Sequence, residues 1–410
     1  MILNLNYHKF TYMENIETKE LKTAFYATFS QGFFATLTFS MFMVNSPILF
    51  DLIDMTKTEF SIGFIIFGIC NVITNQLTTR FLLPKIGSTN CLIIARLLYA
   101  FIPFSIFYFS SYNFFIFVSM LWGISIGIQA PNIFTQVAII EEKTKKILNP
   151  IFKSSFNFGF LLGAGISSLC LGLEIDPVFT TFVVGLFVFI STLTMYFFGL
   201  NMKYDVVNKD PRFSIPNYKI IMFASINMCI IAFMGIIIQW SPLWLVTDLS
   251  APIFLVGSIV IFFNLGEIIS NIFASKLITK LGEIIVGPCF AMVGSTILVL
   301  SIFSQNIIII FIAITLFGML ISNVMPIVFR QAVKNSQNPI PVTISHVSSI
   351  AFVGAIFGPA VVGISAETFG LTFNMYALGV IMFLIALLMF FIMRENKLVG
   401  VEGIEPTPPK

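Results

Sequence analysis

Long apolar runs constrain the fold of this chain more than any other feature of its sequence. An α-helix needs about 20 mostly apolar residues to cross the hydrocarbon core of a bilayer, and such runs recur from residue 23 to residue 393. Charged residues make up 10% of the chain, against about 25% in a soluble protein, so a soluble core cannot account for the runs. The sequence therefore predicts an all-α integral membrane protein with twelve spans, at residues 23–49, 59–83, 90–110, 113–140, 151–173, 177–200, 219–246, 253–278, 284–304, 306–329, 341–366 and 371–393.

The basic residues of the loops predict the orientation, because cytoplasmic loops collect Lys and Arg. They fall on one side of the predicted spans, whereas only Lys57 falls on the other side, beside Asp51, Asp54 and Glu59. Both chain ends and the most polar internal segment are then cytoplasmic. The predicted parts are a cytoplasmic N-terminal segment (1–22), a first six-helix bundle (23–200), a cytoplasmic linker (201–218), a second six-helix bundle (219–393) and a cytoplasmic tail (394–410).

The second half of the chain repeats the first half at a fixed offset of 195 residues. The matches include residue types that seldom coincide by chance in so apolar a chain. They are Lys85 with Lys280, Gly87 with Gly282, Pro131 with Pro326, Gln136 with Gln331, Gly159 with Gly354, and Gly163 with Gly358 (280 − 85 = 195). Two parallel six-helix repeats place a pseudo-twofold axis along the membrane normal and a solute site between the halves near the midplane. This arrangement predicts transport by alternating access.

The whole pattern, over about residues 20–395, resembles the major facilitator superfamily of transporters. The family's loop motif between spans 2 and 3 reads roughly G-x-L-a-D-r-x-G-r, and this chain keeps its Leu, one basic residue and its last Gly in both halves. Pro84 and Thr279 stand where the family has Asp. The resemblance implies two bundles of six helices and a gating loop in each half, formed around Lys85 and Gly87 in the first and Lys280 and Gly282 in the second.

A short element of span 7 resembles one subgroup of this superfamily in particular. Gln239-Trp240-Ser241 is similar to the Asp-Trp-Ser element of bacterial fucose-permease-like transporters and related uncharacterised inner-membrane members, with Gln239 in place of the acid. Pro242 follows and is expected to break span 7 at its outer end. The 195-residue offset pairs Trp240 with Asn45 of span 1. Trp240 is therefore expected either in an outer gate or in an interfacial aromatic belt.

Polar residues inside the spans are the candidates for a solute cavity, since a polar group in hydrocarbon is costly and its position informative. Span 1 carries three of them seven residues apart, and span 4 carries a stripe on one helical face. The alternative is hydrogen bonding between helices, which contributes about 1 kcal/mol or less per contact in membranes. The candidate cavity residues are Gln31, Thr38, Asn45, Ser125, Gln129, Asn132, Asn227, Gln239, Trp240 and Asn323.

Two charged side chains lie inside predicted spans. Glu267, in span 8, is the one acidic residue well inside any span. It is either a protonatable coupling group or the partner of a basic residue such as Lys153. Arg96, in span 3, is expected to extend its long side chain to the cytoplasmic headgroups.

The sequence predicts a secondary active transporter that moves a small polar or amphiphilic solute across the bacterial inner (plasma) membrane. A facilitative uniporter, an exporter without proton coupling, and a non-transporting receptor or scaffold are the alternatives.

Neither an enzyme nor a cofactor or metal is expected, since no catalytic cluster of His, Asp, Glu or Cys, no CxxC pair and no P-loop occurs. The expected partners are the solute, the lipid bilayer and, if Glu267 couples transport, protons. The net charge of +3 follows from the cytoplasmic loops and implies no nucleic-acid partner, and a monomer is expected.

Overall fold

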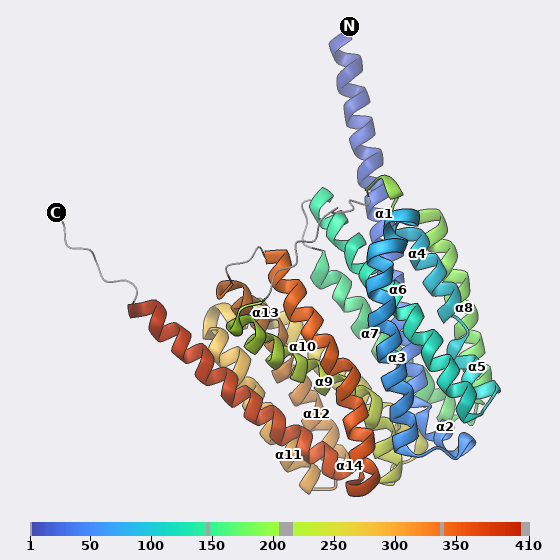
Figure 1. Cartoon of the computed structure of the whole chain (residues 1–410), viewed down its shortest axis with the longest axis vertical. Helices are drawn as coiled ribbons and strands as arrows, with labels where there is room; N and C mark the ends of the chain where they lie inside the picture. Colours follow the sequence, from blue (N-terminus) through green and yellow to red (C-terminus); the bar gives the residue numbers. More distant parts are fainter. Residues whose placement is uncertain (1, 145–147, 205–215, 337–339, 403–410) are drawn as a thin grey trace, which may run out of the picture. The chain divides into compact units, whose positions relative to one another are not determined.

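The computed structural model describes residues 2–144, 148–204, 216–336 and 340–402 (Figure 1). These ranges are almost wholly helical. The chain divides into two compact units, Met1–Arg212 and Phe213–Lys410, called unit 1 and unit 2 below. The boundary falls inside the predicted linker 201–218. Parts of the predicted terminal segments and linker, namely residues 1, 205–215 and 403–410, lie outside the described residues.

Unit 1 is a bundle of long helices joined by short turns. Its first helix, α1, packs along α7, and α3 packs along α6. A π-helical turn, Thr78–Leu82, joins α3 to α4. The helices are α1 (Ile2–Val44), α2 (Ser46–Ile53), α3 (Lys57–Leu77), α4 (Leu83–Tyr99), α5 (Ile102–Tyr108), α6 (Tyr112–Thr144), α7 (Asn149–Gly172) and α8 (Pro177–Phe198).

Unit 2 repeats this packing. Its first helix, α9, packs along α14, and α10 packs along α12. A 3-10 turn, Ile253–Leu255, precedes α10, and a π-helical turn, Ile285–Cys289, precedes α11. The helices are α9 (Tyr218–Thr247), α10 (Ser258–Leu281), α11 (Phe290–Phe303), α12 (Ile307–Ile321), α13 (Val324–Lys334) and α14 (Ile340–Glu402).

Ten helical stretches among the described residues are long and apolar enough to cross a membrane. Two of them, Lys57–Tyr108 and His346–Glu395, contain 52 and 50 residues. At 1.5 Å per residue each would be about 75 Å long, more than twice the thickness of the hydrocarbon core. Each contains a glycine with positive φ, Gly87 (81°) and Gly370 (78°), and α14 reverses direction in Figure 1. Counting both stretches as helical hairpins gives twelve crossings, the number that the sequence predicts.

Glycines explain why the first and fifth spans of each unit pack so closely. A Cβ added to Gly159 or Gly163 of α7 would meet the backbone carbonyls of Phe33 and Leu37 on α1. In unit 2, a Cβ on Gly354 of α14 would meet the carbonyl of Met228 on α9, which lies 195 residues after Phe33. The repeated glycines therefore hold corresponding helix pairs together in the two units.

The prolines of spans 1 and 7 have different effects, although they occupy equivalent positions. Pro47 lies in the first turn of α2, after span 1 has broken at Asn45. Pro242 lies inside α9, which continues to Thr247. The expectation that Pro242 breaks span 7 is wrong. The residues around Pro242 are buried on all sides, and this packing offsets the one hydrogen bond that proline removes.

Candidate functional site

Arg96 lies at the centre of a polar network inside unit 1. It is fully buried on α4, nine residues beyond Gly87 (96 − 87), or about 13 Å along the helix. Its Nε donates to Oε1 of Gln31 at 2.7 Å, its Nη1 to Oγ of Ser191 at 2.7 Å, and its Nη2 to the carbonyl oxygen of Ser30 at 3.1 Å. The expectation that Arg96 reaches the headgroups is wrong. Its side chain instead turns inward, where α1 and α8 supply acceptors for all three of its nitrogens.

The acceptors around Arg96 are neutral. The described residues contain three ion pairs, Lys203–Glu20, Arg330–Glu283 and Lys334–Glu283, and Arg96 belongs to none of them. Besides its hydrogen bonds, Arg96 stacks over the ring of Phe34, with Cζ 5.5 Å from the ring centroid. A charged Arg at the centre of a membrane helix costs about 3 kcal/mol even on the mildest scale. The network therefore gives each nitrogen of Arg96 one acceptor, so three of its five N–H donors are bonded, but it does not neutralise the charge.

The polar stripe of span 1 runs along the buried side of α1. Thr38 Oγ1 donates to the carbonyl of Phe34 at 2.7 Å, and Asn45 Nδ2 donates to Oγ of Ser167 on α7 at 3.1 Å. Gln31 accepts from Arg96 through Oε1, while its Nε2 is buried and has no hydrogen-bond partner among the described residues. Gln31 and Asn45 thus form hydrogen bonds to other helices of unit 1, which is the alternative to cavity lining that the sequence left open. Gln31 also keeps its Nε2 group unused.

The stripe of span 4 divides in a similar way. Ser125 Oγ donates to the carbonyl of Ala95 on α4 at 2.7 Å, so it joins two helices. Asn132 Nδ2 donates to the carbonyl of Ile128 on its own helix, but its Oδ1 has no partner among the described residues. The same holds for Nε2 of Gln129, which lies one turn away from Asn132. Gln129 and Asn132 therefore present an unused donor and an unused acceptor on neighbouring positions of α6.

In unit 2 the candidate residues also fall into bonded and unbonded groups. Asn323 Nδ2 donates to Oγ of Ser270 at 2.9 Å, which joins the start of α13 to α10. Asn227 is fully buried on α9, and neither its Nδ2 nor its Oδ1 has a partner among the described residues. Gln239, three turns further along α9, has an unused Oε1. Asn227 and Gln239 are thus the buried amides of unit 2 that keep binding capacity.

Trp240 bonds to the fifth span of its own unit. Its Nε1 donates to the carbonyl of Pro359 on α14 at 2.9 Å, and the whole side chain is buried. Its counterpart Asn45 bonds to Ser167 on α7, so both members of the pair join the first span to the fifth. Trp244 Nε1 donates to Oγ1 of Thr372 at 2.9 Å. An outer gate at Trp240 stays a prediction.

The loop motif forms an equivalent contact in both units. Gly87 and Gly282 have nearly the same conformation, with φ of 81° and 84°, while Lys85 and Lys280 are exposed beside them. The residue after each glycine meets a glutamine of the fourth or tenth span. Gln136 Nε2 donates to Oγ of Ser88 at 3.0 Å, and Gln331 Nε2 donates to Oε2 of Glu283 at 2.5 Å. The repeat indicated these glutamines, but no spacing rule revealed that they contact the loops.

Glu267 is buried on α10, and only 6% of it is exposed. It lies among other polar residues of this helix, including Asn264, whose amide bonds to the carbonyl of Val260. Within the described residues no three His, Cys, Asp or Glu side chains gather as a metal site requires. The burial of Glu267 is compatible with both roles that the sequence left open.

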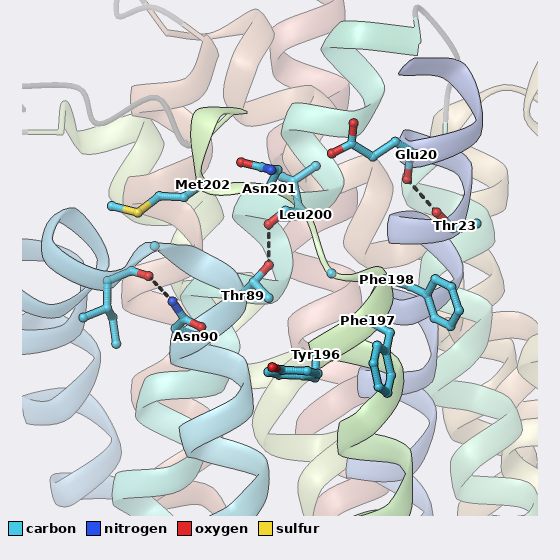
Figure 2. A pocket seen from close by; sticks show the side chains of 13 residues that line it. Glu20, Thr23, Thr89, Asn90, Tyr196, Phe197, Phe198, Leu200, Asn201 and Met202 are labelled. Carbon is cyan, nitrogen blue, oxygen red and sulfur yellow. Dashed lines mark hydrogen bonds between the residues drawn. The ribbon is translucent and has the colours of Figure 1, made fainter. Parts of the chain in front are cut away.

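A cavity of about 380 Å³ lies at the end of unit 1 that carries Gly87 (Figure 2). Its upper wall is formed by Glu20, Asn201 and Met202, and its lower wall includes the ring of Tyr196. Thr89 Oγ1 donates to the carbonyl of Leu200 at 2.6 Å and ties α4 to the chain that follows α8. Sequence reasoning did not predict this cavity, because its wall comes from three segments that are distant in sequence.

Comparisons with known proteins identify the family of the chain. The family model of the Major Facilitator Superfamily matches residues 28–340. An uncharacterised MFS-type transporter of Yersinia pestis is 24% identical over 255 residues, which is 60% of this chain and 64% of that protein. The match thus spans less than two thirds of the relative's length.

Solved structures of transporters share the fold. A bacterial homologue of the human lysosomal transporter Spinster, in an inward-facing and occupied conformation, gives a TM-score of 0.71 at 11% identity and covers 90% of this chain and 96% of its own. The nucleoside transporter NupG gives 0.67 at 13% identity, with 91% and 98% covered. The human organic anion transporter MFSD10 gives 0.61 at 12% identity, with 89% and 99% covered. With its family-model match, its many apolar helices and its two repeated units, the chain belongs to the major facilitator superfamily.

Proposed function

We propose that this membrane transporter is a secondary active transporter for a small polar or amphiphilic solute, working by alternating access in the bacterial plasma membrane. The observation that carries the proposal is a set of buried amides with unused hydrogen-bonding atoms. The set comprises Gln31, Gln129 and Asn132 in unit 1 and Asn227 and Gln239 in unit 2.

Buried polar atoms without partners are uncommon, and each costs about 1–3 kcal/mol of stability. Gln31, Asn132 and Asn227 are fully buried, so water does not compensate this cost at the protein surface. A transporter has a use for such atoms, because a solute must exchange its hydration for hydrogen bonds from the protein. Amides supply both donors and acceptors, which suits hydroxyl, carbonyl and amide groups of a solute.

We also propose that Glu267 is the coupling group, since it is the one acidic side chain well inside a span and it is buried. Proton binding at this carboxylate would link solute movement to the proton gradient. Facilitated transport without protons is the second candidate. The replacement of the acid of the span 7 element by Gln239 favours it, because an amide cannot carry a proton.

The test is solute counterflow in proteoliposomes, using a panel of radiolabelled sugars, nucleosides and small organic acids. We expect exchange of at least one solute and a loss of this exchange in Gln129→Leu and in Asn132→Leu. Gln76→Leu is the matched control, because Gln76 is an exposed amide on α3. If no solute exchanges, or if the two buried variants behave like Gln76→Leu, the proposal fails.

A further inference from the structure

Among the side chains of unit 1 that the structure describes, none supplies a counter-charge to Arg96. The acidic side chains of this unit that the structure describes all lie at or beyond the ends of the predicted spans. They are Glu20, Asp51, Asp54, Glu59, Glu141, Glu142, Glu174 and Asp176. An arginine that only joined helices would need no charge for that purpose, since a neutral donor bonds a carbonyl or a hydroxyl equally well. A buried positive charge at this position therefore points to a bound anion that is not part of the chain.

Gln31 marks the place where such a group would bind. Arg96 Nε donates to Oε1 of Gln31 at 2.7 Å, and this bond fixes which end of the amide is oxygen and which is nitrogen. The nitrogen, Nε2, is buried and has no partner among the described residues. An amide nitrogen only donates, so its partner must be an acceptor. A cation bonded to the carbonyl side of the amide also polarises its N–H groups and strengthens them as donors toward an anion.

We propose that Arg96 and Gln31 form the anion-recognising part of the solute site in unit 1, and that the transported solute carries a single carboxylate. This inference rests on the proposed transport function and adds the chemical class of the solute. Gln31 donates to the carboxylate, and Arg96 is a positioning residue that orients Gln31 and supplies the compensating charge. One buried positive charge balances one negative charge, which favours a carboxylate over a phosphate dianion. The other buried amides then bind the neutral part of the solute.

The test measures thermal stabilisation of the purified full-length protein by matched pairs of compounds. Suitable pairs are nicotinate with nicotinamide, benzoate with benzamide, lactate with lactamide, and gluconate with gluconamide. We expect at least one carboxylate to raise the melting temperature, and its amide partner to need at least tenfold higher concentration for the same shift. Arg96→Gln should weaken carboxylate binding at least tenfold and remove the preference for the charged compound. Arg80→Gln is the matched control, because Arg80 is exposed in the π-helical turn between α3 and α4, and this variant should bind like the wild type.

A second variant separates recognition from folding. Arg96→Lys keeps the charge but loses the planar guanidinium, so it should retain part of the preference for carboxylates even if the protein is less stable. Carboxylate binding that is unchanged in Arg96→Gln would overturn the inference, as would a preference for the neutral compounds. A panel without any stabilising carboxylate would overturn it too. Counterflow of a neutral solute in proteoliposomes would then show that the transport function stands although the inference about the carboxylate has failed.

Discussion

Adding one methyl group to α7 at Gly163 should separate the first and fifth spans of unit 1. In the structure, a Cβ at this position would lie 3.0 Å from the carbonyl carbon of Leu37 and 3.0 Å from Cβ of Ser40, and closer still to the carbonyl oxygen of Leu37. Two of these three atoms belong to the backbone of α1, which cannot turn aside as a flexible side chain can. Gly163→Ala therefore forces the two helices apart.

Gly165 provides a matched control two residues along the same helix. A Cβ at Gly165 would meet nothing within 4 Å. Replacing glycine by alanine in a helix contributes about 1 kcal/mol of stability at either position, so this contribution cancels when the two variants are compared. What remains is the cost of overpacking at Gly163, about 1–3 kcal/mol. Since 1 kcal/mol shifts the melting temperature of a domain of 150–250 residues by about 2–4 °C, Gly163→Ala should melt about 2–12 °C below Gly165→Ala.

The assay is thermal unfolding in detergent, followed by a fluorescent dye that reacts with cysteine. The five cysteines form no disulfide, and Cys91 is buried, so unfolding exposes a new thiol. Gly358→Ala in unit 2 should behave like Gly163→Ala, because its Cβ would lie 2.6 Å from Cβ of Ala232. Equal melting temperatures for Gly163→Ala and Gly165→Ala would refute the view that this glycine sets the helix spacing.

Three further predictions follow from the described contacts and from the sequence. Trp240→Phe removes the indole donor to Pro359 and should cost about 1 kcal/mol, measured as a lower melting temperature; an unchanged value would show that this bond contributes nothing. Glu267→Gln should abolish accumulation driven by a proton gradient but spare solute exchange, and accumulation at the wild-type level would make Glu267 a structural residue. Cysteines placed at Asp54 and Asp176 in a cysteine-free background should react with an impermeant maleimide added outside the cell, and reaction only after permeabilisation would reverse the predicted topology.

The sequence predicted most of the fold because the 195-residue repeat can be detected from the residue types alone, without knowing which helices are in contact. Gly159 and Gly354 match in sequence, and the structure places both against the same carbonyl position of the first span. Gly87 and Gly282 match as well, and both adopt positive φ where the chain turns. Apolar length and repeated glycines depend only on the residue types present, so a single sequence reveals them.

The partners of the polar residues could not be predicted in the same way. Helical periodicity places Gln31, Thr38 and Asn45 on one face, but it does not say which helix that face meets. Arg96 is the clearest case, since its partner Ser191 lies 95 residues away on α8. On an isolated membrane helix, an arginine is expected to extend its side chain to the nearest headgroups. This expectation fails for Arg96 because α1 and α8 together enclose its guanidinium.

The hydrogen bonds between α1 and α7 can form only late in the synthesis of unit 1. Thr36 Oγ1 donates to the carbonyl of Phe156, and Ser40 Oγ donates to that of Phe160, each across 120 residues of chain. A ribosome adding about 5–20 residues per second needs about 6–24 s to make that length. The first helix must therefore wait inside the insertion machinery or the bilayer, with both hydroxyls restricted to bonds within their own helix, until the fifth helix emerges. A nascent chain stalled before residue 156 would leave the face of α1 that packs against Gly159 and Gly163 open to chaperones and membrane proteases.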